Sequence, residues 1–399
     1  MTTSAPSSAG RITELDALRG LAVIGIVWMN VYVFALPAQG YYNPTVGGVP
    51  EGPFDRMVWA TSFVFIEDKF RTLFAMLFGA GCIILLEKGG ARPWRAHYAR
   101  MAALFVIGVV HATLLASNDI LRAYAIAGCA LSFIAHLPPR ALVAIAVGLV
   151  AVHLGGGITV FGAAVYDWSQ GRFGSDMVYL VERNFGNDAR AVQFSLEQGH
   201  EAFGERVVRR IDGLPAQLST ILGAVPINLA AMALGMAFWK DRMFAGEWRT
   251  FRLQRLAAVC AVLSVPPLLW MANWVAENGF PGVLVGPVSL IASAPFDTAL
   301  GVAYAALAMA FFEKNGAVTG RLAAVGRLSL TNYLMTSVVL AALFASWGLG
   351  LFGQVTRAEA FALSFVPIVA MIVWSPIWVA QLGQGPFERL WRSAAKALS

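Results

Sequence analysis

Ten long apolar runs follow one another along the chain, separated by short polar segments. Most of them reach the roughly 20 apolar residues that a helix needs to cross the hydrocarbon core of a bilayer. The pattern therefore predicts an all-α fold, a polytopic transmembrane helical bundle of about ten spans. The runs lie near Leu18–Leu36, Val58–Leu86, Trp94–Ala116, Ile120–Ala135, Ala141–Val165, Leu218–Phe238, Leu256–Trp274, Val283–Phe312, Leu328–Trp347 and Ala360–Val379.

The composition supports the membrane interpretation and excludes a set of soluble domains. Hydrophobic residues make up 58% of the 399 residues and charged residues only 13%, whereas soluble domains carry about 25% charged residues. The lipid bilayer is therefore the expected surrounding. The net charge of +6 does not indicate a nucleic-acid partner, because cytoplasmic loops of membrane proteins carry an excess of Lys and Arg.

The positive residues alternate between successive loops. By the positive-inside rule, this alternation places both termini in the cytoplasm, which requires an even number of spans. Loops after the second, sixth and eighth runs and the C-terminal tail are rich in cations: Lys88, Arg92, Arg95 and Arg100; Lys240, Arg242, Arg249, Arg252 and Arg255; Lys314, Arg321 and Arg327; Arg389, Arg392 and Lys396.

The long connection near the middle divides the chain into two halves. We expect a polar cytoplasmic tail at residues 1–17, a five-span half at 18–166 with the active site, and a second five-span half at 217–382. Residues 167–216 form an extracytoplasmic loop of mixed charge, predicted to hold one or two amphipathic helices on the membrane surface. Residues 383–399 form a basic cytoplasmic tail.

Four polar residues are expected at a similar depth toward the outer side: Asn30, Asp68, His111 and Asp119. Ionisable or amide groups at membrane depth are costly, so each indicates a functional site. His111 and Asp119 flank a tight hairpin, and a carboxylate beside an imidazole fixes its tautomer and raises its basicity, as a general base requires. The alternative is a structural His bonded to a backbone carbonyl, with Asp119 only capping the next helix.

A second set of polar residues is expected nearer the cytoplasm. Asp16 and Arg19 lie three residues apart, as in a helical ion pair. Lys69 and Arg71 lie too deep to anchor a helix end, so they either pair with Asp68 or Asp297 or line a path for an anionic ligand. The residues predicted to bind such a ligand are Arg19, Arg71, Arg122, Arg327, Asn332 and Tyr333.

Four segments resemble one known family of membrane proteins, the YeiB-type family, which has no assigned function. They are LDALRGLAVIGIVWMN (Leu15–Asn30), DKFRTLFAMLFGAG (Asp68–Gly81), GVVHATLLASNDILRAYAIAG (Gly108–Gly128) and GRLSLTNYLMTS (Gly326–Ser337). The resemblance extends from residue 11 to about residue 390 in order and spacing.

That family is similar in turn to heparan-α-glucosaminide N-acetyltransferase and the transmembrane acyltransferase superfamily. The matching positions are Leu15, Asp16, Arg19, Gly20, Ala22 and Asn30, followed by Asp68 and Gly79. The resemblance implies that Asn30 and Asp68 belong to an active site. It also implies transfer from cytosolic acyl-CoA to an acceptor on the outer side. The catalytic His of that enzyme lies before the Asp, but residues 31–67 contain no His, so the base must come from elsewhere, and His111 lies at a suitable depth.

The leading hypothesis is therefore a bacterial inner-membrane acyltransferase. Acetyl-CoA or another acyl-CoA is the expected co-substrate, no metal is predicted, and the acceptor is a glycan, lipid or small molecule. His111 would act as base, Asp119 would orient it and Asn30 would bind the oxyanion. The alternatives are a proton-coupled transporter or flippase and a non-catalytic protein that binds a lipid or partner. Packing into a homodimer is compatible with such a bundle.

Overall fold

The computed structural model describes residues 13–87, 93–312 and 316–398, all in helices and short connections. Lys88, Arg92, Lys314 and the first twelve residues of the expected N-terminal tail lie outside the described residues. The helices are α1 (Thr13–Ala35), η1 (Ala38–Tyr41), α2 (Pro53–Phe65), α3 (Lys69–Glu87), α4 (Pro93–Leu114), α5 (Ile120–Ile134), α6 (Pro139–Ser169), α7 (Asp176–Phe185), α8 (Ala189–Gly199), α9 (Phe203–Asp212), α10 (Leu214–Lys240), α11 (Thr250–Glu277), α12 (Gly282–Pro287), the π-helical η2 (Val288–Ala292), α13 (Ala294–Phe311), α14 (Ala317–Arg327), α15 (Ser329–Phe344), α16 (Arg357–Leu363), α17 (Phe365–Leu382) and α18 (Pro386–Leu398).

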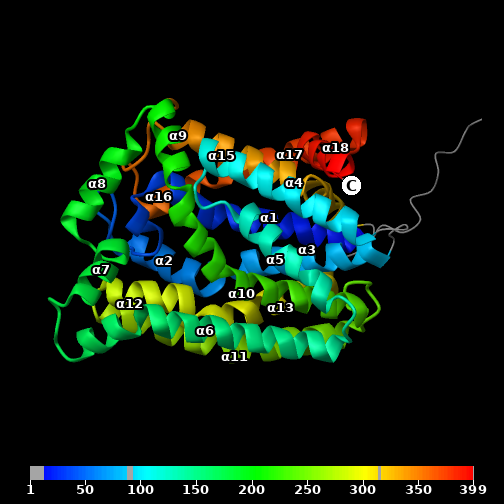
Figure 1. Ribbon diagram of the computed structural model, residues 1–399, viewed down its shortest axis with the longest axis horizontal. Coiled ribbons are helices and arrows are strands. Elements are labelled where there is room, and N and C mark those ends of the chain that lie inside the picture. Colours follow the sequence, from blue (N-terminus) through cyan, green and yellow to red (C-terminus); the bar gives the residue numbers. More distant parts are fainter. Residues whose placement is uncertain (1–12, 88–92, 313–315, 399) are drawn as a thin grey trace, which may run out of the picture.

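The long helices run side by side and form a bundle with two distinct ends (Figure 1). The start of α1 and the C-terminal helix α18 lie at one end, which we call the termini end. The short helices α7, α8 and α9 lie at the opposite end, the loop end. Among the helices long and apolar enough to span a membrane, α6 and α11 have the smallest buried share, which is typical of helices that face lipid.

The all-helical membrane fold is confirmed, with fewer full spans than expected. Among the described residues, eight stretches are long and apolar enough to cross a membrane, and the pair α14–α15, bent by 79°, raises the number to nine. The fourth predicted run, Ile120–Ala135, became α5, which has only 15 residues. At 1.5 Å per residue it is about 22 Å long, shorter than a hydrocarbon core of about 30 Å.

The expected segment boundaries also needed adjustment. Helix α1 already begins at Thr13, so residues 13–17 of the predicted polar tail are helical. The loop at 167–216 contains three short helices where one or two were expected, and the tail at 383–399 forms α18. Polar and charged residues on one face explain both departures, because such sequences form amphipathic helices rather than irregular loops.

Three irregular segments lie inside the bundle, two within apolar runs and one between the third and fourth runs. Residues 66–68 form a turn between α2 and α3, residues 115–119 join α4 to the short α5, and η2 separates α12 from α13. Non-helical backbone at membrane depth is tolerated where protein buries it or where it lines a cavity. The first two interruptions carry the polar residues of the site described below.

Helices α3 and α10 pack closely because each has a glycine that lies against the backbone of the other helix. A methyl group at Gly79 would lie 2.2 Å from the Met232 carbonyl oxygen, and one at Gly235 would lie 1.8 Å from the Met76 carbonyl oxygen. Small residues at such crossings allow helix backbones in membranes to approach closely.

We predict that Gly235→Ala destabilises the bundle by about 1–3 kcal/mol, because the added methyl must push two backbones apart. The measurement is thermal unfolding of the purified protein in detergent. Gly148→Ala on α6 is the control, since a methyl there meets nothing within 4 Å. Equal unfolding temperatures for Gly235→Ala and wild type would show that the close crossing does not contribute to stability.

Candidate functional site

Two cavities extend into the bundle, one from each end. The loop-side cavity has a volume of about 600 Å³ and is lined by Asn30, Asp68, Asp119 and residues of α9 and α10, among others. The termini-side cavity has a volume of about 560 Å³ and is lined by residues of α1, α3, α4, α5, α15 and α18. Tyr333 lines both cavities. The two cavities therefore approach each other at this side chain.

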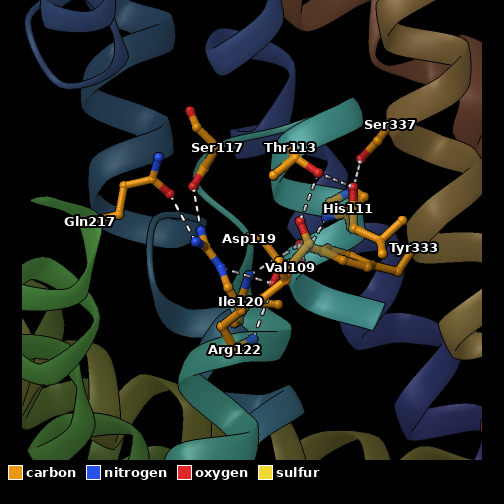
Figure 2. Close-up of polar contacts among 11 residues, drawn as sticks. Val109, His111, Thr113, Ser117, Asp119, Ile120, Arg122, Gln217, Tyr333 and Ser337 are labelled. Carbon is orange, nitrogen blue, oxygen red and sulfur yellow. Dashed lines mark hydrogen bonds and ion pairs between the residues drawn. The ribbon is translucent and has the colours of Figure 1, made fainter. Parts of the chain in front are cut away.

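The carboxylate of Asp119 lies beside Tyr333 and accepts hydrogen bonds from residues of three helices (Figure 2). Its Oδ1 lies 2.7 Å from His111 Nδ1 and accepts a longer hydrogen bond of 3.4 Å from the Tyr333 hydroxyl. Its Oδ2 accepts from the Arg122 backbone N–H at 3.0 Å, which caps α5. The predicted His111–Asp119 contact and the alternative capping role are thus both present, one on each oxygen.

His111 lies behind Asp119 when viewed from the loop-side cavity. It is buried, and it does not line that cavity. An ionised carboxylate only accepts, so the proton of the contact belongs to His111 Nδ1, and in the neutral imidazole Nε2 accepts from Ser337 Oγ at 2.9 Å. Sequence reasoning missed Ser337, because 226 residues separate it from His111 and a hydroxyl in an apolar helix carries no signal of its own.

Arg122 holds the turn between α4 and α5 against α10. Its guanidinium donates to Gln217 Oε1 at 2.9 Å and to the Ser117 carbonyl at 2.7 Å, and its Nε lies 3.8 Å from Asp119 Oδ2 (Figure 2). Gly108 on α4 leaves room for this arrangement, because a methyl group there would lie 2.6 Å from Asp119 Oδ2. The Arg122–Asp119 pair is therefore part of the α4–α5 hairpin, and the missing side chain of Gly108 gives it room.

A second ion pair lines the same cavity at the break between α2 and α3. Asp68 has a φ of 58°, a left-handed conformation that Asp tolerates better than most residues. Both of its carboxylate oxygens accept from the Arg71 guanidinium at 2.7 Å. Arg71 also donates to Asn228 Oδ1 at 3.2 Å. The predicted pairing of Arg71 with Asp68 is confirmed, and Asn228 is an addition that the sequence did not indicate.

Asn30 faces this cavity with its amide available. It lines the cavity, and within the described parts of the chain its side chain makes no hydrogen bond. The structure thus brings Asn30, Asp68 and Asp119 to one cavity, as their expected depth predicted.

Lys69 lies apart from this cavity. It is fully buried, lies 2.6 Å from Asp297 and also bonds the Phe63 carbonyl.

The termini-side cavity is positively charged. Arg19 and Arg327 line it as predicted ligand-binding residues, and Arg100 and Arg392 line it as well. Arg19 donates to Asp16 at 2.8 Å, the expected helical ion pair. Arg392 comes from α18, whose Glu388 accepts hydrogen bonds from the backbone N–H groups of Leu330 and Thr331 and so fixes α18 against the start of α15.

Asn332 has a structural role in this arrangement. It lines neither cavity. Its amide donates to the Val325 carbonyl at 3.0 Å and to Ser375 at 3.1 Å, and its oxygen accepts from Trp374 at 3.1 Å. Successive helical residues point about 100° apart, so Tyr333 reaches the cavities and Asn332 does not.

Comparison with known proteins identifies relatives over nearly the whole chain. The uncharacterized protein YeiB of Escherichia coli (strain K12) is 30% identical over 391 residues, which cover 96% of this chain and 95% of YeiB. The uncharacterized protein YxaH of Bacillus subtilis (strain 168) is 29% identical over 410 residues, covering 96% and 94%. No solved structure matches.

A family model points to the same group. The model described as a protein of unknown function, DUF418, matches residues 238–397. The resemblance to YeiB-type proteins is therefore confirmed, and the descriptions of these relatives name no activity. The chain is an integral membrane protein that belongs to the DUF418 family, together with YeiB and YxaH.

Proposed function

We propose that this protein is a transmembrane acyltransferase. It moves an acyl group, of the acetyl type, from acyl-CoA in the termini-side cavity to a hydroxyl or amine of an acceptor in the loop-side cavity. The observation that supports this best is the approach of the two cavities at Tyr333, directly beside Asp119. Two substrates that enter from opposite ends would meet at these groups.

The termini-side cavity suits acyl-CoA in charge and shape. Its four arginines, Arg19, Arg100, Arg327 and Arg392, lie toward the end of the bundle, and arginine recognises phosphate groups through paired hydrogen bonds. Deeper in, Leu77, Leu104 and Leu121 give it an apolar wall on the way to Tyr333. An elongated thioester arm would follow this wall while the phosphates remain at the arginines.

The loop-side cavity supplies the groups that acyl transfer needs. The acceptor oxygen or nitrogen attacks the thioester carbonyl, the C–S bond breaks, and the acceptor's proton passes to the Asp119–His111 pair and then to the departing thiolate. Asp119 faces the acceptor and takes its proton, and the His111 Nδ1–H behind it holds the carboxylate in place. The Asn30 amide would donate to the developing oxyanion, an interaction worth about 3–4 kcal/mol in soluble enzymes.

The distribution of charge supports an orientation in the membrane. The loop between α10 and α11 and helix α18 lie at the termini end (Figure 1), and α14 packs against the start of α1 there. These segments carry Arg242, Arg389 and Arg321. By the positive-inside rule this end faces the cytoplasm, where acyl-CoA is made available. The relatives come from bacteria, so we assign the protein to a bacterial cytoplasmic membrane.

A proton-coupled transporter is the second candidate. Tyr333 lines both cavities and bonds Asp119, which in turn bonds His111, so these linked groups could carry a proton between the cavities as well as serve catalysis. The two functions differ in one requirement, because only the acyltransferase needs a specific site for CoA.

We predict that Asp119→Asn lowers the rate of acyl transfer by about 10²–10⁴-fold, the range associated with loss of a general base. Asn also caps helices well, so α5 should remain folded. The assay follows release of free CoA from acetyl-CoA by the purified protein. Asp188→Asn is the matched control, because Asp188 caps α8 in the same way, away from the cavity. Equal rates for the two variants would exclude Asp119 as part of the base.

His111→Ala should reduce turnover by a similar factor, since Asp119 then loses the hydrogen bond that orients its carboxylate as a base. His153→Ala serves as control, because this residue bonds the Leu290 carbonyl and lines neither cavity. If His111→Ala retains full turnover, the assigned base is wrong.

Arg392→Gln should weaken CoA binding about tenfold, as expected for loss of one charge-assisted hydrogen bond. Binding is measured by calorimetry at low and high salt, and higher salt should weaken the wild type. Arg321→Gln, an exposed cation at the same end that lines neither cavity, is the control. Absence of CoA binding in the wild type would favour the transporter.

A further inference from the structure

Short helices from the long central loop form the mouth of the loop-side cavity. Helix α8 contributes Gln198, α9 contributes Arg209 and Arg210, and Gly213 and Gln217 come from the junction with α10 and from its first turn. These residues face a cavity whose floor includes the turn that precedes the short α5. Helix α5 begins inside the bundle, so its first residues lie away from the loop helices α8 and α9. The loop-side cavity occupies the space between them.

The charges that line this cavity do not balance. Four arginines and two aspartates line it, so the lining has an excess of two positive charges: Arg71, Arg122, Arg209 and Arg210 against Asp68 and Asp119. Each aspartate already pairs with an arginine of the floor, Asp68 with Arg71 and Asp119 with Arg122. The excess therefore lies at the mouth, on α9.

Arg210 carries most of this excess. Arg209 forms an ion pair with Glu201 at 2.8 Å, whereas Arg210 forms none with the described residues. Burial, together with the neighbouring Arg206 and Arg209, lowers the pKa of Arg210 to about 10. It thus remains a cation at neutral pH, and the nearest acid, Glu201, is paired with Arg209, which favours an anion from outside.

Uncharged polar groups surround the path from the mouth to Asp119. Asn30, Asn118 and Gln198 line the cavity, and their side chains make no hydrogen bonds within the described ranges. Each amide offers two donors and an acceptor oxygen. Such groups match the alternating donors and acceptors of neighbouring hydroxyls.

We propose that the loop-side cavity binds an anionic polyol, a molecule in which a phosphate or carboxylate stands beside sugar-like hydroxyls. The anion lies against Arg210, and the free amides bind the hydroxyls. One hydroxyl then lies near Asp119, and its role as acyl acceptor rests on the proposed function. Two sources share this chemistry: a soluble sugar phosphate and the headgroup of a phospholipid.

The test is ligand binding, which needs no acyl-CoA. Glucose 6-phosphate and glucose form the soluble pair of probes, and thermal unfolding of the purified protein reports their binding. Phosphatidylglycerol and phosphatidylcholine form the lipid pair, with bound lipid counted by native mass spectrometry. We expect the charged member of at least one pair to bind at least tenfold more tightly than its neutral or zwitterionic counterpart.

Arg210→Gln should weaken that binding about tenfold, because one charge-assisted contact is lost, and Arg210→Lys should retain part of it. The control is Arg172→Gln, which removes the same charge from an exposed pair with Asp167 between α6 and α7. Binding of glucose 6-phosphate supports the soluble source, and binding of phosphatidylglycerol alone supports the lipid source.

The proposal is overturned if both members of each pair bind equally, if none binds, or if Arg210→Gln binds as wild type does. Its failure is distinguishable from failure of the proposed function. A protein that binds the anionic polyol but never consumes acetyl-CoA retains the ligand site and loses the acyltransferase assignment.

Discussion

The arrangement of this site depends on one buried carboxylate. Asp119 receives hydrogen bonds from His111 on α4, from the Arg122 backbone on α5 and from Tyr333 on α15. A buried carboxylate is tolerated only when such partners compensate for the loss of water. Satisfying Asp119 therefore fixes three helices relative to one another, and it does so where the two cavities approach. The same contacts that allow the charge to be buried also place a base between two binding spaces.

Interrupted helices explain why polar groups gather in a bundle that is otherwise apolar. The left-handed turn at Asp68 and the hairpin before α5 each end a helix inside the protein. Each interruption presents one Asp–Arg pair to the loop-side cavity. Close glycine contacts elsewhere, such as Gly235 against Met76, hold the uninterrupted helices together. The bundle thus combines tightly packed helices with a few short ones that leave room for ligands.

Features that depend on neighbouring residues in the chain were predictable from the sequence. Hydropathy located the helices, and short separations identified the His111–Asp119 and Asp68–Arg71 contacts. Contacts between distant helices were not predictable, because hydropathy does not determine which faces meet. Ser337 beside His111 and Arg210 over the cavity are examples. The sequence also suggested ten spans, since hydropathy alone does not show that α5, capped by Asp119, begins inside the bundle.

The central claim is that an acyl group crosses between the two cavities at Asp119 and Tyr333. The most direct test uses proteoliposomes in which the protein has one known orientation. Acetyl-CoA with a labelled acetyl group is supplied on the side of the termini, and an impermeant acceptor that carries hydroxyls and an anionic group is supplied on the other side. The account predicts labelled acetyl-acceptor on the side opposite the acetyl-CoA and free CoA on the side of its addition. Absence of labelled acceptor, with the protein folded and CoA bound, would contradict it.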